Sequence, residues 1–172
     1  GATLPHEYGD MFAWGETRPK ESYLDTNYIF FIEYSDKGPY HYAQYSKYTW
    51  NAKKQEYVDG KEILDAEDDA ATVNWGEKWC MPTREQIDEI ATYCNVYRED
   101  IIVNDQKILA LRIESKLNDN VMVLPFSGIE YNNYPNPRMD CWYWTREVYK
   151  EDDYKAYFYL LKNDIFTWDW LG

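Results

Sequence analysis

Residues 64–94, LDAEDDAATVNWGEKWCMPTREQIDEIATYC, decide how this chain folds, because they carry the start and stop signals of two short helices. Asp68 and Asp69 open the first helix, where carboxylates bind unpaired backbone N–H groups and suit the positive end of the helix dipole. Gly76 predicts its end, since glycine readily adopts the left-handed conformation that terminates a helix. The first half of the stretch therefore predicts one short, capped helix.

The second half of the stretch predicts another helix, which begins after Pro82. Thr83 and Gln86 form a capping box, in which each side chain satisfies the other's backbone donor. Apolar residues at helical spacing predict one face turned to the core: Ile87, Ile90, Ala91 and Cys94. Three residues between the helices are expected to plug that core: Trp75, Trp79 and Met81. Nothing in the stretch points to a reaction centre.

Four ordered blocks of the sequence resemble the Fibrobacter succinogenes major paralogous domain, a family related to the bacterial DUF1566 domains. These blocks are YGDMFAWGET (8–17), DAEDDAATVNWG with WCMPT (65–76, 79–83), LPFSG (124–128), and CWYWT followed by AYFYL (141–145, 156–160). The resemblance covers most of the chain. It implies a C-type-lectin-like fold and an exported, cell-surface protein of a Bacteroidetes-type bacterium.

The chain departs from the family pattern at three places. Cys80 stands where the family usually has arginine, and Phe126 and Ser127 replace two small residues. The family also closes with a glycine-led strand that has no direct counterpart here. Either that strand is missing, or residues 165–171 take its place in altered form.

Length and composition fit one α+β domain over residues 1–172, with two helices packed on a small twisted antiparallel sheet and long loops. Aromatic residues make up 19% of the chain, and large rings with polar tips suit a fold whose long connections need anchoring. Alternation and turn signals predict strands at residues 11–14, 28–34, 108–115, 121–124, 142–147, 156–162 and 165–171. Asp59 and Gly60 predict a hairpin between residues 56–58 and 61–64, and residues 131–140 are typical of a surface loop.

The charge of the chain limits its partners. A formal net charge of −13 argues against nucleic acid and anionic membrane, which both bind positive surfaces. No stretch is apolar enough to span a bilayer, so direct membrane insertion of this segment is not expected. We expect an export signal or lipid anchor to have been removed ahead of Gly1, which places the protein outside the cell or on its surface, as a secreted protein or lipoprotein.

The sequence offers little material for catalysis. The two histidines, His6 and His41, are too few for a multi-histidine metal site. Cys80, Cys94 and Cys141 lack metal-ligand spacing, and a disulfide between Cys80 and Cys141 stays open. Among 31 acidic residues, some two can always be proposed as the carboxylate pair of a glycosidase, so their number points to no particular site. An enzyme remains the alternative: a carbohydrate-active hydrolase, or an oxidase like the formylglycine-generating enzymes, whose cysteine pair has no counterpart here.

A calcium site is the alternative to metal-free binding. Calcium-dependent lectins use a glutamate-proline-asparagine loop and a later tryptophan-asparagine-aspartate strand. Residues 134–136 (YPN) and 162–164 (KND) follow that order without the glutamate and the tryptophan. A second acidic group could also attract a cation, although helix capping explains it more simply: Asp65, Glu67, Asp68 and Asp69. No metal or cofactor is therefore expected.

Metal-free recognition is expected on one face of the lectin-like domain. The candidate ligand-binding residues are Tyr131, Tyr134, Asn136, Tyr143, Trp168 and Trp170. Trp168 and Trp170 alternate along a predicted strand and would share one side of it, although packing against neighbouring loops is the alternative. The sequence thus predicts a non-catalytic exported or cell-surface module that adheres to, or binds, a glycan or a surface protein.

Overall fold

The computed structural model describes residues 8–36, 41–131, 134–136, 141–150, 156–162 and 165–171, with the backbone alone for residues 129–131, 134–136, 159–162 and 165–171. The described residues form two α-helices, one 3₁₀ turn and four small antiparallel sheets. This mixture of few helices and antiparallel strands agrees with the predicted α+β class. None of the helices in the described part of the chain has the length and apolar character needed to cross a bilayer.

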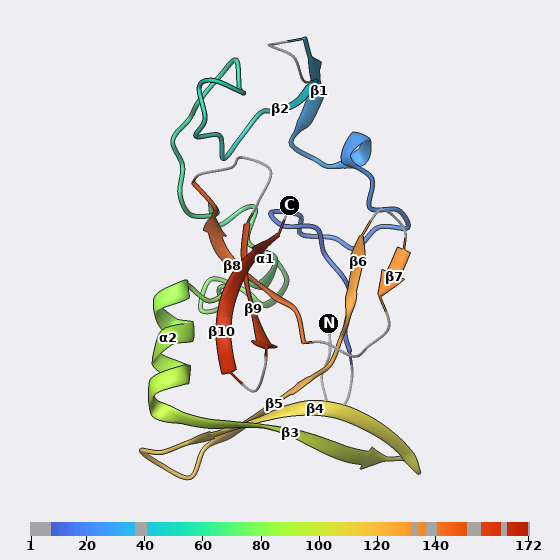
Figure 1. Ribbon diagram of the computed structural model, residues 1–172, viewed down its shortest axis with the longest axis vertical. Helices are drawn as coiled ribbons and strands as arrows, with labels where there is room; N and C mark the ends of the chain where they lie inside the picture. The colour runs from blue at the N-terminus through green and yellow to red at the C-terminus, as the bar shows by residue number, and fades with distance from the viewer. Residues whose placement is uncertain are drawn as a thin grey trace.

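Three of the sheets follow one another along the long axis of the molecule, and the β6–β7 pair lies beside the middle one (Figure 1). At one end lies the hairpin of β1 (Phe31–Ser35) and β2 (Tyr42–Tyr45), preceded by the 3₁₀ turn η1 (Asp25–Asn27). At the other end lies a sheet of β3 (Cys94–Val103), β4 (Gln106–Ser115) and β5 (Val121–Pro125). Between them lies the sheet of β8 (Tyr143–Val148), β9 (Ala156–Lys162) and β10 (Ile165–Leu171), while β6 (Ile129–Tyr131) pairs with β7 (Tyr134–Asn136).

Both helices begin where the capping signals predict. Helix α1 (Ala70–Trp75) starts at Asp69, whose carboxylate accepts a 3.0 Å hydrogen bond from the backbone N–H of Thr72, and ends at Gly76 with φ of +93°. Helix α2 (Arg84–Tyr93) starts with the predicted capping box of Thr83 and Gln86, at 2.9 and 3.2 Å. The helix-start signals in the sequence are therefore confirmed.

The buried residues form two hydrophobic clusters on either side of β8. The Leu111 core contains Ile87, Leu111, Ile113, Phe126 and Cys141. The Trp14 core contains Trp14, Phe30, Tyr48, Leu64, Val148 and Ala156. Tyr143 packs against the first and Trp144 against the second, because neighbouring residues of a strand face opposite sides. The prediction of a single domain over residues 1–172 stays a prediction.

The tryptophans between the helices are not part of either core, so the prediction that they plug it is wrong. Trp75 is 57% exposed and Trp79 is 58% exposed, whereas Met81 packs against the Trp14 core. On α2, Ile87 is buried and Ile90 packs against the Leu111 core, but Ala91 is exposed. The physical reason is that α1 has only six residues, less than two turns, and buries none of them, so the ring at its end stays at the surface.

Two predicted strands near the N-terminal half are also wrong. Residues 11–14 form no ladder, and they lead into a turn in which the Glu16 N–H bonds the Ala13 carbonyl. Residues 61–64 do not pair with 56–58, because β8 takes their backbone groups instead. The Leu64 N–H donates to the Arg146 carbonyl at 2.9 Å, and the Val148 N–H to the Glu62 carbonyl at 3.0 Å.

Most other predicted strands are confirmed. The hairpin of residues 108–115 and 121–124 corresponds to β4 and β5, and the pair 142–147 and 156–162 to β8 and β9. Residues 28–34 overlap β1, and residues 165–171 form β10, which pairs with β9 at the edge of the sheet. The loop predicted at residues 131–140 instead contributes to the β6–β7 hairpin, while residues 132–133 and 137–140 lie outside the described part of the chain.

Candidate functional site

The predicted ligand-binding residues lie on four strands, β6, β7, β8 and β10. Tyr131 on β6 and Tyr134 on β7 are register partners in the backbone ladder, and Asn136 ends β7. Trp168 and Trp170 lie on β10 opposite Tyr159 and Tyr157. Tyr143 on β8 is also a register partner of Tyr159, so Trp168 and Tyr143 occupy one row across the sheet. The backbone places these residues but leaves their shared binding role a prediction.

Tyr143 has a structural contact of its own. Its hydroxyl donates a 2.8 Å hydrogen bond to the Pro125 carbonyl, and its ring packs against the Leu111 core. Burial and the nearby Cys141 raise the pKa of the Tyr143 hydroxyl above its ordinary value. This side chain therefore ties β8 to the end of β5.

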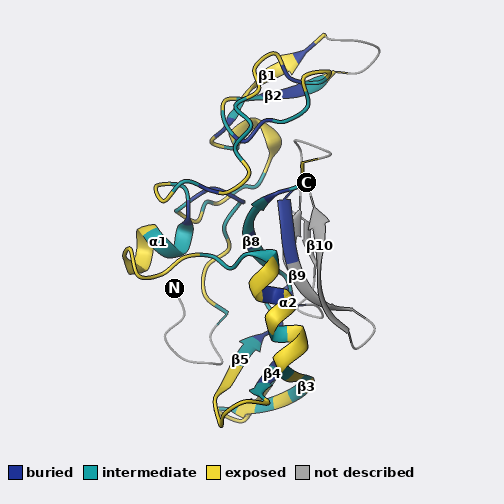
Figure 2. Ribbon diagram, turned by 90° about the vertical axis from the view of Figure 1, so that its left-hand side faces the viewer, coloured by how far each residue is buried: buried dark blue, intermediate teal, exposed yellow. Residues whose placement is uncertain are grey.

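Two exposed tryptophans, Trp75 and Trp79, form a second, unpredicted candidate site. Trp75 and Trp79 contact each other edge to face, with ring centroids 5.7 Å apart and an interplanar angle of 74°. We call this pair the indole surface. Figure 2 shows α1 and the turn after it on the outside of the molecule, largely exposed. Both indoles therefore present apolar area to solvent.

Hydrogen bonds hold the backbone beneath the indole surface. The Gly76 N–H donates to the Thr72 carbonyl at 2.9 Å, and the Trp79 N–H donates to the Gly76 carbonyl at 2.9 Å. The Thr72 hydroxyl donates to the Trp79 carbonyl at 2.8 Å. The amide of Asn74 donates to the Thr17 carbonyl at 3.0 Å, which joins α1 to the N-terminal segment. The two rings are thus attached to a turn whose backbone is held by its own hydrogen bonds.

Asp69 anchors the same turn from below. Its carboxylate is buried and accepts hydrogen bonds from the Met81 N–H at 3.0 and 3.2 Å as well as from the Thr72 N–H. Both ends of the Trp75–Trp79 segment are therefore fixed to one side chain. Sequence reasoning missed this surface because tryptophan alone suggests burial. The signal that could have found it is the polar run Gly-Glu-Lys between the rings.

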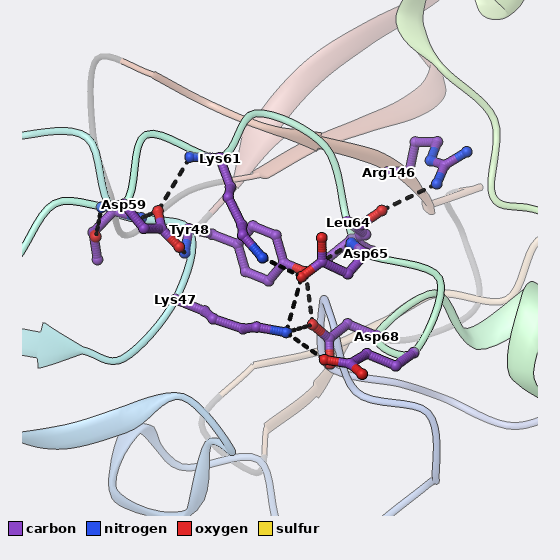
Figure 3. Close-up of polar contacts among 10 residues, drawn as sticks. Lys47, Tyr48, Asp59, Lys61, Leu64, Asp65, Asp68 and Arg146 are labelled. Atoms are coloured by element: carbon purple, nitrogen blue, oxygen red, sulfur yellow. Dashed lines mark hydrogen bonds and ion pairs between the residues drawn. The ribbon is translucent and has the colours of Figure 1, made fainter.

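The acidic group at the start of the 64–94 stretch is joined by a lysine. The carboxylate oxygens of Asp65, Glu67 and Asp68 lie within 4.8 Å of one another. The ammonium of Lys47 lies 3.0, 2.8 and 2.7 Å from them (Figure 3). Asp65 also pairs with Lys61. The local chemistry is therefore that of a salt-bridge network, and exposed carboxylates of this kind are not by themselves a sign of a metal.

The charged groups of this network shift one another's pKa values. Burial lowers the pKa of Lys47, but hydrogen bonds to Asp68, Glu67 and Asp65 outweigh it and raise that pKa above its ordinary value. Hydrogen bonds from Lys61 and Lys47 lower the pKa of the Asp65 carboxyl. The Tyr48 hydroxyl donates to Asp68 at 2.6 Å and accepts from the Asp65 N–H at 2.8 Å. The network thus fastens the chain before α1 to the Trp14 core.

The remaining residues weighed for chemistry lie apart. None of the three cysteines forms a disulfide: Cys80 is exposed, Cys94 is half-buried and Cys141 is buried in the Leu111 core, so the bridge between Cys80 and Cys141 that the sequence left open is not formed. His41 lies 2.9 Å from the Asp36 carboxylate on an exposed loop, and His6 lies outside the described residues. Of the two segments compared with calcium-lectin motifs, residues 134–136 form β7, and residues 163–164 lie outside the described chain.

Comparison with protein-family models, with curated proteins and with solved structures yields no match to this chain.

Proposed function

We propose that this chain is a non-catalytic ligand-binding module that takes a glycan on the indole surface. The observation that carries the proposal is the pairing of two exposed tryptophans on a hydrogen-bonded turn. Exposed large aromatic rings are otherwise costly, and aromatic side chains are enriched among the residues that dominate binding energies.

A glycan fits this surface better than a protein does. Val73, two positions before Trp75, is an exposed large apolar residue, while the residues between the two rings, Gly76, Glu77 and Lys78, are small or charged and exposed. A stable protein interface needs about 800 Å² on each partner around an apolar centre. A saccharide instead presents apolar C–H groups to an aromatic face and hydroxyls to a polar rim, and the two perpendicular rings offer one stacking face and one flank.

We propose further that the module has the C-type-lectin-like fold and belongs with the Fibrobacter succinogenes major paralogous domain. Support comes from the sequence blocks and from the two helices that precede the antiparallel strands β3 to β5 and β8 to β10. The same resemblance supports an extracellular or cell-surface location.

The test is a glycan and protein array probed with the wild-type chain, Trp75→Ala and Trp79→Ala, each with and without EDTA. We expect glycan binding that persists in EDTA and weakens by about tenfold or more in each tryptophan variant. Tyr57→Ala, which removes another exposed ring (62% exposed), is the matched control and should bind as the wild type does. Melting temperatures of all variants show whether the fold is kept.

Several outcomes would contradict the proposal. Glycan binding that both tryptophan variants retain would move the site elsewhere. Binding confined to proteins would replace the glycan as the ligand. EDTA-sensitive binding would favour the calcium alternative, and turnover of a glycoside without retained binding would favour the hydrolase.

A further inference from the structure

Strand β3 is the outer strand of its sheet and one of the longest in the described chain. It spans ten residues, Cys94–Val103, and pairs with β4 along its whole length. Exposed side chains lie along it, among them Tyr97 at 42% and Ile102 at 77%. A long outer strand presents a row of backbone N–H and C=O groups that another strand can pair with.

The register of the sheet shows which residues of β3 present these groups outward. The Leu109 carbonyl accepts from the Phe126 N–H on the β5 side, and the Lys116 N–H donates to the Tyr93 carbonyl on the β3 side. Backbone groups alternate in direction along a strand, so the even-numbered residues of β4 face β3. Their partners on β3 are odd-numbered, as in the pair Val103 and Gln106. The even-numbered residues of β3, from Cys94 to Ile102, therefore direct their backbone groups to the free edge.

We propose that two copies of this chain pair through β3, antiparallel, about a twofold axis at Glu99. This register places Arg98 opposite Asp100 of the second copy, and the symmetry forms that pair twice. Both residues are even-numbered, so their outward backbone groups meet as a hydrogen-bonded pair. The two sheets would join into one sheet of six strands.

Charge selects this register over its neighbours. A shift that keeps the same side chains on the same face moves the axis by one residue. It then places Arg98 opposite Arg98 of the second copy, or Asp100 opposite Asp100. Like charges directly opposite are destabilising, whereas opposite charges stabilise a cross-strand pair. Asp100 also lies 2.8 Å from Lys107, and Arg98 lies over the Phe126 ring. Each charged side chain therefore also has a contact within its own chain.

The remaining pairs of the register are compatible with it. Val96 meets Ile102 of the second copy on one face, and Tyr97 meets Ile101 on the other, so the exposed Tyr97 and Ile102 each gain a half-buried apolar neighbour. The two Glu99 carboxylates approach at the axis, but each already has a guanidinium nearby. The Arg112 Nη1 lies 3.5 Å from the Glu99 carboxylate within its own chain.

The test reverses each of the two charges in turn and measures the molar mass of the particle by sedimentation equilibrium. Wild-type chain, of 20.7 kDa, is expected to shift to twice that mass as its concentration rises. In a dimer of the Arg98→Asp variant, carboxylates face carboxylates at both pairs, and in a dimer of the Asp100→Arg variant, guanidinium groups face guanidinium groups. Each variant alone should therefore dimerise at least about tenfold more weakly. In an equal mixture of the two variants, every carboxylate again faces a guanidinium across the axis, so the mixture should regain an affinity within about threefold of wild type.

A matched pair of lysine substitutions tests the same edge without reversing charges. Ile102→Lys places a charge at the paired edge and should weaken dimerisation, whereas Ile32→Lys, on exposed β1, should not. Recovery in the mixture also shows that both charge variants are folded. A wild-type chain that stays monomeric at every concentration would overturn the proposal. So would variants that dimerise as the wild type does, or a mixture that stays monomeric.

Discussion

Lys47 is the residue on which the acidic network before α1 depends. Its ammonium lies within 3.0 Å of the carboxylates of Asp65, Glu67 and Asp68. We expect Lys47→Met to destabilise the fold by about 1–3 kcal/mol at neutral pH, because Glu67 and Asp68 then lose their lysine partner beside Asp65, which keeps its pair with Lys61. Chemical denaturation gives the free energy of unfolding. Lys53→Met, which removes an exposed lysine, is the control and should change that free energy little.

The difference in unfolding free energy between wild type and Lys47→Met should depend on pH in a definite direction. The pKa of Lys47 is raised, so its contribution is complete below the ordinary lysine value of 10.5 and is lost as pH rises past its folded value. The pKa of Asp65 is lowered, so its contribution is complete above the ordinary aspartate value of 3.8 and is lost as pH falls through its folded value. The gap between wild type and Lys47→Met should therefore hold between those values and shrink in acid. An unchanged gap in acid would contradict the network.

At the residue scale, the sequence predicts polar roles better than apolar ones. The capping roles of Asp69, Thr83 and Gln86 are local, and hydrogen bonds within four residues decide them. Whether Trp75 is buried depends on whether another part of the chain packs over its ring, and Trp75 is 57% exposed. The indole N–H of Trp14 reaches the Thr145 carbonyl at 2.9 Å, a contact across most of the chain that no local pattern contains.

At the scale of elements, the turn between β3 and β4 fixes the longest hairpin of the described chain. Asn104 and Asp105 have φ of +49° and +61°, as a two-residue type I′ turn requires. Asn104→Val should cost about 1–2 kcal/mol of unfolding free energy, because a β-branched residue is strained in the left-handed region. Gln106→Val, two positions on at an exposed strand position with no positive φ, is the control. Equal stability of both variants in denaturant titrations would show that the turn is not strained.

The same turn shows why some strands were predictable and others not. The alternation of residues 108–115 predicts β4, whereas β3, on the other side of Asn104 and Asp105, is not among the predicted strands although it pairs with β4 along its whole length. Asp59-Gly60 carries a similar turn signal, but its flanking residues find other partners. The Asp59 carboxylate accepts from the backbone N–H groups of Tyr48 and Thr49, and residues 62–64 bond β8. Competition from distant strands, not turn chemistry, decides that case.

At the scale of the whole molecule, the sheet of β8, β9 and β10 separates the two cores while belonging to both. Tyr143 packs on the Leu111 core, and Trp144 and Val148 pack on the Trp14 core. The chain also crosses between them more than once, since Leu64, Ile87 and Val148 lie in the Trp14, Leu111 and Trp14 cores in that order. Composition alone cannot predict this pair of cores, because residues far apart in the sequence form each cluster.

Two leucines test whether these cores unfold together as one domain. Leu64 and Leu111 are 2% and 0% exposed, one in each core, so Leu64→Ala and Leu111→Ala should each cost about 2–5 kcal/mol. Leu117→Ala, at a position 75% exposed, should stay within about 0.5 kcal/mol of wild type. In differential scanning calorimetry we expect a single transition that moves down as a whole in both core variants, because β8 links the cores. A second transition that only one of the two substitutions moves would instead divide the chain into two domains.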